Sequence, residues 1–308
     1  MKFTALKALR GDAFVITWHE SAILIDGGMR NTYGQIKKAI TGKNLKSVFV
    51  THVDYDHLGG IIGLASDVDV EISDVDFYMN HPDLVTSYDG SKVAFKHGES
   101  LRQILKKRNK ECLTVLEGES LVIGDLSIEV LSPNGEVCTK LHENWDASRV
   151  IEDGQMRYLD RQKNNGDIIN RSSLVLTVEH QNKKILLLGD TNAEVIEKIL
   201  SEKNKINKNL SKFDLVKLSH HGSKHNTSSK LLSLIECHNY YISTNGAVYG
   251  HPDSEVIKIL SDRAVELKSF FNVYLNYDIE IDIRDKCDFE IHNLKFILQK
   301  ELFFNEGD

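Results

Sequence analysis

Two histidines and two aspartates stand within six positions of this chain, directly after the apolar run Val48-Phe49-Val50. The segment is Thr51-His52-Val53-Asp54-Tyr55-Asp56-His57-Leu58-Gly59-Gly60. Imidazole nitrogens and carboxylate oxygens are typical ligands of zinc, manganese or iron, and the carboxylate oxygens could also bind harder ions. Asp and Gly are common in turns after strands, but turn chemistry does not require two interleaved histidines. The segment therefore predicts a metal site.

The preceding apolar run predicts a strand that delivers these residues at its C-terminal end. On an extended chain alternate side chains share a face, so we expect His52, Asp54 and Asp56 to converge. His57 would reach in from the following turn. The Gly59-Gly60 pair would let the backbone turn closely around the site.

Three further polar clusters follow strand-like apolar runs. They are Gly189-Asp190, Ser219-His220-His221-Gly222-Ser223 and Tyr249-Gly250-His251-Pro252. Each is a weak signal alone, because Gly-Asp pairs are common in turns and a single histidine is usually a surface or hydrogen-bonded residue. Ligands at the ends of several strands of one sheet meet in space, so together the clusters predict one composite site.

Short strands with intervening helices indicate an α/β protein built in layers. We expect one domain over residues 1–308, because only three prolines and no Ser- or Gly-rich linker occur in the chain. Residues 134–170 predict a loop or lid insertion with at most one short helix, and residues 265–304 predict additional strands. The other expected elements are strands at 13–18, 22–25, 48–52, 120–123, 127–131, 173–178, 184–188, 215–218 and 240–243, and helices at 33–40 and 193–200.

The composition limits the classes of protein to which this chain can belong. Hydrophobic residues make up 41% of the 308 residues and charged residues 27%, and no apolar run approaches the length that spans a bilayer. We therefore expect no membrane association and, without a signal peptide, a cytoplasmic protein. The four cysteines form no Cys-x-x-Cys pair, which argues against a thiolate zinc site and a disulfide scaffold.

The net charge of −7 does not favour binding of polyanions, so nucleic-acid binding would need a local basic patch. Residues 91–110 offer one, on a stretch with helical apolar spacing. Two interpretations stay open for it: a solvated helix face or a phosphate-binding surface. Its bases, set against the single acid Glu99, are Lys92, Lys96, Arg102, Lys106, Lys107, Arg108 and Lys110.

The ordered set from Thr51 to Gly60, then Asp190, then the later histidines, resembles the metallo-β-lactamase superfamily. That resemblance implies an αββα sandwich with a dinuclear metal site along one edge. The chain is more closely similar to the hydrolase domain of ComEC-type competence proteins and their soluble relatives. The additional matches are Gly11-Asp12-Ala13-Phe14, Ile25-Asp26-Gly27-Gly28, Asp54, Asn170 with Ser173-Leu174-Val175-Leu176, and the 219–223 and 249–252 clusters; they span residues 11 to 252.

The resemblance implies that His52 and Asp54 bind a first metal, that Asp56, His57 and His251 bind a second, and that Asp190 bridges them. Two departures affect the first metal. Asp54 stands where the superfamily usually has histidine, and no histidine lies between positions 142 and 180, where Asn170 occupies the place of a third-motif ligand. The sequence leaves open whether the site binds one or two divalent ions, and whether they are zinc or manganese. One possibility is a single ion held by Asp56, His57, Asp190 and His251.

We take Asp56, His220 and His221 as the catalytic residues. On an extended chain His220 and His221 would point to opposite sides, so we expect only one to face the metals. By the resemblance to nucleases, that one would contact the scissile phosphate or the leaving group, and the other would be a buried, orienting histidine. Ser223 and His225 could assist from the same loop, and Tyr249 has either a packing or a catalytic role.

Three functions remain. The leading one is a phosphodiesterase or nuclease that uses a metal-activated water on a nucleic acid or nucleotide. The second is a hydrolase of a small ester, thioester, lactone or lactam. The third is a degenerate metal-binding module with protein partners from the same operon, in a defence-type system. The sequence contains no Gly-x-Ser-x-Gly elbow and no phosphate-binding loop of the Gly-x-x-x-x-Gly-Lys-Ser/Thr type.

Overall fold

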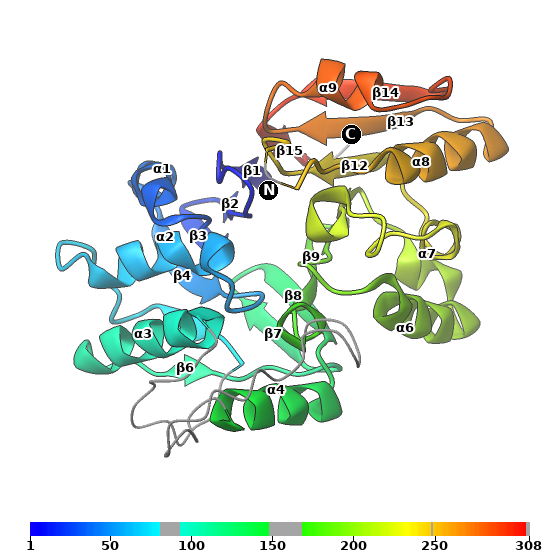
Figure 1. Ribbon diagram of the computed structural model, residues 1–308. Helices are drawn as coiled ribbons and strands as arrows, with labels where there is room; N and C mark the ends of the chain where they lie inside the picture. The colour runs from blue at the N-terminus through cyan, green and yellow to red at the C-terminus, as the bar shows by residue number, and fades with distance from the viewer. Residues whose placement is uncertain (81–92, 148–167, 248, 306–308) are drawn as a thin grey trace, which may run out of the picture.

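Two β-sheets face each other in the computed structural model of the chain, which describes residues 1–80, 93–147, 168–247 and 249–305 (Figure 1). Within these residues the first sheet has seven strands. In sheet order they are β15 (Glu301–Phe303), β1 (Lys2–Ala5), β2 (Phe14–Trp18), β3 (Ser21–Ile25), β4 (Asn44–Phe49), β5 (Asp76–Tyr78) and β6 (Cys112–Leu113). Pairing is antiparallel up to β3 and parallel from β3 onward.

The second sheet has eight strands in the described part of the chain. In sheet order they are β14 (Leu294–Leu298), β13 (Phe271–Leu275), β12 (Asn239–Ile242), β11 (Leu215–Lys217), β10 (Lys183–Leu187), β9 (Val175–His180), β8 (Leu126–Ser132) and β7 (Ser120–Ile123). The strands from β14 to β10 are parallel, and β10, β9, β8 and β7 are antiparallel neighbours.

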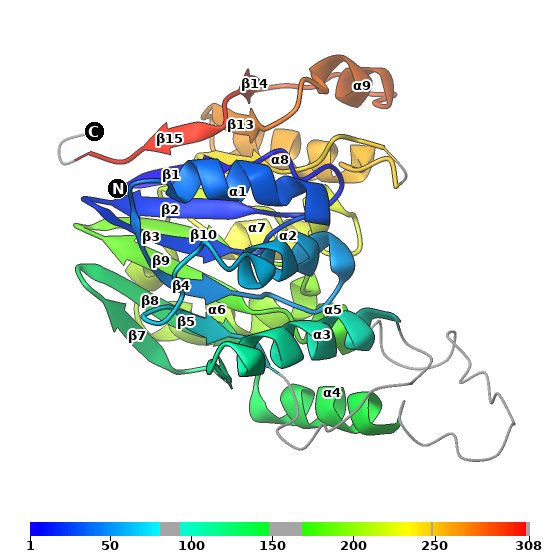
Figure 2. The ribbon, with the colours of Figure 1, turned by 90° about the vertical axis from the view of Figure 1, so that its left-hand side faces the viewer.

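Helices cover the outer faces of both sheets. Figures 1 and 2 show α1, α2 and α3 over the first sheet, and Figure 1 shows α6, α7 and α8 beside the second. The helices are α1 (Tyr33–Ile40), α2 (Tyr55–Ser66), α3 (Val93–Lys107), α4 (Gly135–Ala147), α5 (Ile168–Arg171), α6 (Ala193–Ile206), α7 (Ser229–Leu234), α8 (Ser254–Glu266) and α9 (Glu280–Asp285). The expected αββα sandwich is confirmed.

Strand β2 shows why fully apolar runs form this architecture. All five of its residues are buried, because one face of the strand meets helices and the other meets the second sheet. Phe14, Ile16 and Trp18 belong to the apolar cluster between the sheets, whereas Val15 belongs to the cluster under the helices. The period of two in a strand thus divides one run between two cores.

The strand directions collect the polar clusters at one end of the sandwich. Strands β3 and β4 are parallel, and so are β10, β11 and β12, so the segments that follow them leave each sheet on one side. Asp26, the 51–57 segment, Asp190, the 219–222 segment and Ser243 follow these strands. Asp12 joins them because β2 runs antiparallel to β3.

The structure alters the expectation for residues 134–170 and bears out the additional strands expected in residues 265–304. Residues 134–170 contain the 13-residue helix α4 and the short helix α5; residues 148–167 lie outside the described part. Leu141 of α4 and Ile169 of α5 belong to the same apolar cluster as buried residues of α2. Tertiary packing therefore stabilises α4, whose mostly polar sequence did not predict a helix. Residues 265–304 contain β13, β14 and β15, with α9 between the first two.

Among the described residues, no helix combines the length and apolarity that crossing a bilayer requires.

Candidate metal centre

The His52–His57 segment is a strand end followed by a helix start. Strand β4 ends at Phe49, Asp54 is the N-cap of α2, and Asp56 and His57 lie in the first turn of that helix. The expectation that His52, Asp54 and Asp56 converge by alternation along an extended chain is therefore wrong. The helix start replaces the alternation, and the ring of His57 is buried against the strand ends.

Gly59 and Gly60 have a different role from the one expected. Both lie inside α2, where a Cβ atom on Gly60 would stand 2.0 Å from the carbonyl oxygen of Gly27, and one on Gly59 would stand 2.6 Å from the amide nitrogen of Arg30. The two glycines let α2 approach the loop after β3. That approach brings His57 to Asp26.

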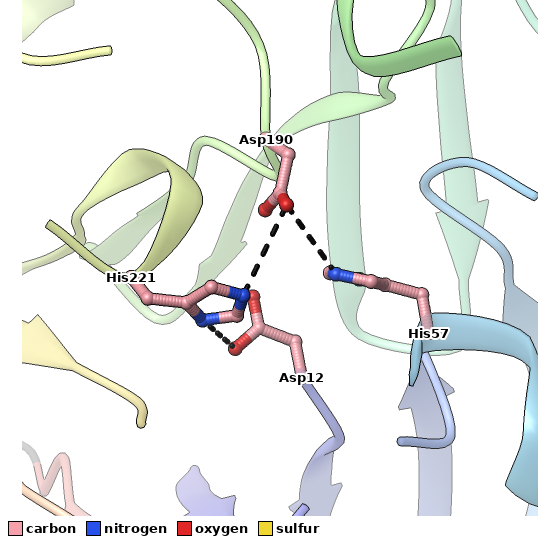
Figure 3. A group of neighbouring side chains, drawn as sticks. All are labelled: Asp12, His57, Asp190 and His221. Atoms are coloured by element: carbon pink, nitrogen blue, oxygen red, sulfur yellow. Dashed lines mark ion pairs between the residues drawn. The ribbon is translucent and has the colours of Figure 1, made fainter. Parts of the chain in front are cut away.

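Asp190 lies at the centre of four imidazole rings. Its Oδ2 atom is 3.4 Å from Nε2 of His57, 3.8 Å from Nε2 of His52, 3.8 Å from Nε2 of His220 and 3.9 Å from Nε2 of His221. Figure 3 shows His57 and His221 pointing at Asp190 from two different elements. The carboxylate and three of the rings are buried, and His220 is 29% exposed.

Hydrogen bonds fix His57 and His52 in the same tautomer. Nδ1 of His57 lies 2.8 Å from Oδ2 of Asp26 and donates to that carboxylate. Thr51 donates its hydroxyl proton to Asp26 at 2.7 Å, so its oxygen can accept from Nδ1 of His52 at 3.0 Å. In both rings Nδ1 carries a proton and Nε2 faces Asp190, so the neutral form of each ring would present its Nε2 lone pair on that side.

His221 and His220 follow the same rule. Nδ1 of His221 donates to the carbonyl oxygen of Ser243 at 2.7 Å. Nδ1 of His220 lies 3.2 Å from Oδ1 of Asn226, whose amide nitrogen donates to the carbonyl oxygens of Asp190 and Thr191 and so fixes its orientation. Four Nε2 atoms thus face one carboxylate oxygen, and in the neutral form of each ring the Nε2 atom would offer a lone pair to a metal.

The expectation that only one of His220 and His221 faces the site is wrong. The two residues are not extended: their φ angles are +45° and +58°, and Gly222 continues the left-handed turn at +85°. A left-handed pair turns both side chains to the same side. Non-glycine residues adopt this region at an energetic cost, and such positions cluster at functional sites.

Asp12 and Lys217 form a buried ion pair behind His221. The ammonium of Lys217 contacts Oδ2 of Asp12. Figure 3 shows Asp12 beside His221, where Oδ1 of Asp12 lies 3.4 Å from Nδ1 of His221. Burial alone would raise the pKa of Asp12, but Lys217 and His221 hold it below its usual value. Although Asp12 is near enough to act as a ligand, it lies on the Nδ1 side of the ring, where it orients His221.

The other predicted ligands lie at the edge of this group. Oδ2 of Asp54 is 3.7 Å from Nε2 of His52, and Oδ2 of Asp56 lies 3.4 Å from Nε of Arg10. The ring of His251 lies 5.4 Å from that of His220, between centroids, and its Nδ1 is 3.5 Å from Asp253. The structure therefore gathers His52, His57, Asp190, His220 and His221 tightly, with Asp54, Asp56 and His251 around them.

Ser173 contacts the site near the place where the third-motif histidine was expected. Its hydroxyl lies 3.3 Å from Nδ1 of His52 and accepts from the backbone amide of Asp190 at 3.3 Å. It thus contacts His52 on the Nδ1 side of the ring, whereas the carboxylate of Asp190 faces Nε2.

Burial and charge act on the site in opposite directions. Burial, together with the neighbouring His57, lowers the pKa of His52 to about 4. Burial also acts to lower the pKa of His57, but Asp190 and Asp26 raise it well above its ordinary value. For Asp190 burial acts to raise the pKa, whereas His57 and His221 hold it well below the usual range. Protein without a metal therefore places a proton on His57 between two carboxylates.

The donor set fits a divalent transition metal. Nε2 of His52 and Oδ1 of Asp190 are buried and make no hydrogen bond. A buried, unsatisfied imidazole nitrogen and carboxylate oxygen are costly unless a cation completes them. Imidazole nitrogens mixed with carboxylates suit zinc and manganese.

Sequence reasoning missed the orienting residues. Asp12 and Asp26 stand in short motifs beside apolar runs, and Lys217 is a lysine inside the otherwise apolar strand β11, where it is fully buried. A charged residue in a buried strand needs a partner, which is the signal that was available for Lys217.

Three of the seven bases in segment 91–110 make contacts within the protein. The guanidinium of Arg108 donates to the carbonyl oxygens of Asp67 and Val70 after α2, Arg102 pairs with Glu99, and Lys110 donates to the carbonyl of Ser73. Lys106 and Lys107 are exposed. Lys92 and the side chain of Lys96 lie outside the described part. These contacts favour the solvated-face interpretation.

Residues 6–139 match the family model of the metallo-beta-lactamase superfamily. The match includes the His52–His57 segment and ends before Asp190. Comparison with curated proteins gives no match. The finer resemblance to ComEC-type proteins stays a prediction.

The fold of the chain is also similar to the folds of solved structures. Zinc-bound PqqB from Methylobacterium extorquens has 12% identity and a TM-score of 0.50, and the match covers 90% of this chain and 98% of that one. YhfI from Bacillus subtilis, described as a metallo-beta-lactamase fold protein, has 10% identity and a TM-score of 0.48, with 98% of each chain covered. The human short-form tRNase Z has 13% identity and a TM-score of 0.45, with 78% and 91% covered. At these identities the PqqB match supports the fold and nothing finer.

Proposed function

We propose that this protein is a member of the metallo-β-lactamase superfamily and a metal-dependent hydrolase that cleaves phosphodiesters. The match of residues 6–139 to the family model and the likeness of the fold to PqqB support the family assignment. The observation that carries the proposal is the group of four Nε2 atoms around Oδ2 of Asp190, with Arg10 at its edge.

The chain offers ligands for one or two ions, zinc or manganese. His52, Asp54 and Asp190 would hold one ion. His57, Asp56, Asp190 and His221 would hold the other, with His221 in the place first assigned to His251. When bound, such an ion supplies a Lewis acid and lowers the pKa of the attacking water.

His220 and Arg10 are the residues that would contact the phosphodiester. His220 is partly exposed and is fixed by Asn226, so its Nε2 is presented to a substrate at the opening of the site. The side chain of Arg10 is 37% exposed. Its guanidinium carbon lies 6.0 Å from the ring centroid of Tyr249, which is also exposed. A guanidinium suits an anionic phosphate oxygen, and an uncharged ester does not require it.

A small ester or lactone is the second candidate, and one observation favours it. A cavity of about 390 Å³ adjoins the loop that carries His251 and is lined by Gly246, Ile279, Asp282, Ile283, Asp285 and Lys286. Two of these residues are acidic and two are apolar. Such a lining suits a small uncharged group better than a polyanion.

Parallel assays separate these functions. Protein prepared with zinc or with manganese is given bis(p-nitrophenyl) phosphate, single-stranded DNA, RNA and a cyclic dinucleotide, and in parallel p-nitrophenyl acetate and a lactone. We expect phosphodiester cleavage that is lost in Asp190→Asn and His57→Ala, while the circular dichroism spectra of both variants stay native. Ester cleavage alone would establish the second function. Metal binding without either activity would establish the binding module.

A further inference from the structure

Three ligand-type side chains meet at the end of the sandwich opposite to the Asp190 centre. His19 lies in the turn between β2 and β3, Asp125 in the turn between β7 and β8, and His180 at the end of β9. Asp12 precedes β2 and His19 follows it. Asp190 follows β10, whereas His180 pairs with Lys183 at the start of β10. The two groups therefore occupy opposite ends of the strands.

The three side chains are close enough to share one ion. One ligand atom from each lies within 4.8 Å of the other two. Nε2 of His19 is 3.4 Å from Oδ2 of Asp125, and the two imidazole rings lie 6.0 Å apart between centroids at an interplanar angle of 65°. Tetrahedral zinc with bonds of about 2.0–2.1 Å holds its ligand atoms about 3.3 Å apart. The ligand atoms therefore need to approach one another by at most about 1.5 Å to satisfy that geometry.

The burial of the three residues suits that adjustment. His180 is 3% exposed and gives the group a fixed inner member. The side chains of His19 and Asp125 are 66% and 68% exposed, so they can rotate at little cost. Their exposure also leaves room for water as a fourth ligand.

The backbone holds the two outer residues in place. His19 has a φ of +47°, and Gly124, next to Asp125, has a φ of +61°. A Cβ on Gly124 would stand 3.4 Å from Nε1 of Trp18, so the β7–β8 turn lies against the residue that precedes His19. Turns from both sheets are thus packed together at this point, and His19 and Asp125 are presented as a pair.

We propose that His19, Asp125 and His180 form a second metal site for a zinc-type dication such as Zn²⁺, Ni²⁺ or Cu²⁺. Two imidazoles and one carboxylate are a common ligand set for these ions. The site would link the β2–β3 turn of the first sheet to the β7–β8 and β9–β10 turns of the second. Its role is structural, because it lies at the end of the strands away from the Asp190 centre.

Trp18 provides a local reporter. The chain has two tryptophans, so Trp145→Phe leaves Trp18 alone, next to His19. In that background, Cu²⁺ or Ni²⁺ at micromolar concentration is added to the full chain, with and without His19→Ala/Asp125→Asn. The control is His292→Ala, another exposed histidine that lies 3.8 Å from an acid, Glu290. Metal content after dialysis against zinc is measured on the same proteins.

We expect quenching of Trp18 fluorescence that disappears in the double variant, and a zinc content lower by one ion per chain, with no change in the control. Hydrolytic activity stays unchanged in all three proteins, because neither position belongs to the Asp190 centre. Equal quenching and equal zinc content in the double variant and its parent would overturn the proposal, as would binding that requires millimolar metal. His19 and Asp125 are exposed turn residues, so their replacement leaves the fold intact, and circular dichroism verifies this.

Discussion

The carboxylate of Asp26 accepts a hydrogen bond of 2.8 Å from Nδ1 of His57, and Nε2 of the same ring points at Asp190 from 3.4 Å. Asp26 also accepts from the amide and the hydroxyl of Thr51, whose oxygen is the partner of His52. One buried carboxylate thus sets the orientation of two rings of the centre.

Asp26→Asn should weaken metal binding about 10–100-fold, because an amide NH₂ facing Nδ1 favours the tautomer with a proton on Nε2. Competition against a fluorescent zinc chelator measures the affinity. The matched control is Asp74→Asn, an exposed aspartate on the loop before β5. Unchanged affinity in Asp26→Asn would show that Asp26 does not set the tautomer.

Metal binding should release about one proton at pH 7. The raised pKa of His57 keeps this ring protonated in metal-free protein, whereas His52, with a pKa of about 4, is already neutral. Affinity should therefore increase about ten-fold per pH unit until the pH passes the raised pKa of His57. Calorimetry in buffers of different ionisation enthalpy counts the protons, and a count of zero would contradict the assignment.

The same group makes metal-free protein sensitive to alkaline pH. Because the pKa of His57 in the folded protein lies above the ordinary value of 6.5, the contribution of His57 to stability is complete below pH 6.5. It is lost as the pH rises through the folded pKa. The Tm in a chelator should fall over that range, and His57→Ala should flatten the fall.

Lys217→Met should destabilise the protein by about 3–5 kcal/mol, because it leaves the carboxylate of Asp12 buried without its cation. The double variant Lys217→Met/Asp12→Asn should recover much of that loss, since no buried charge remains. Urea unfolding in a chelator measures both. The control is Lys212→Met, which breaks an exposed pair with Glu236 and should cost at most about 1 kcal/mol. Equal losses in the single and double variants would refute the coupling.

Arg10→Ala should raise KM for a phosphodiester about ten-fold or more, which corresponds to the loss of one hydrogen bond to a charged group. KM for p-nitrophenyl acetate should change little. Metal content must be measured too, because Arg10 pairs with Asp56. Lys224→Ala, which removes an exposed lysine paired with Glu255, is the control. An equal effect on both substrates would mean that Arg10 acts through Asp56 and not on the phosphate.

Asp67→Asn should lower the Tm at neutral pH and have a much smaller effect near pH 2. Asp67 accepts from Lys37 at 2.7 Å and from the hydroxyl of Tyr33, which joins α1 to the end of α2, and these bonds lower its pKa from 3.8 to about 2. A lowered folded pKa contributes stability above pH 3.8, and this contribution is lost as the pH falls towards 2. Thermal melts from pH 2 to 7 test it against Asp69→Asn, and a constant difference in Tm would contradict it.

Many helices and strands could be predicted from the sequence, because a run or a periodic pattern of apolar residues within a short segment indicates its secondary structure. The expected helix at 33–40 coincides with α1, and the expected strand at 120–123 coincides with β7. Helix α4 was not predicted, since Cys138 and Leu141 are its buried apolar residues and the rest of its described side chains are mostly polar. Helix α2 was not predicted either, because the ligand residues and glycines at its N-terminal end resemble the residues of a turn.

The sequence by itself determined the chemistry of the centre, because His52, His57, Asp190, His220 and His221 follow strands whose parallel order places their ends together. Only the tertiary structure decided how these side chains are presented. The left-handed turn brings both His220 and His221 to Asp190, and Asp26, Ser243 and Asn226 decide which nitrogen each ring offers. The physical reason is that the free nitrogen of an imidazole is set by the hydrogen-bond partner of the other nitrogen. For His57 and His221 that partner lies 31 and 22 residues away, on a different strand end.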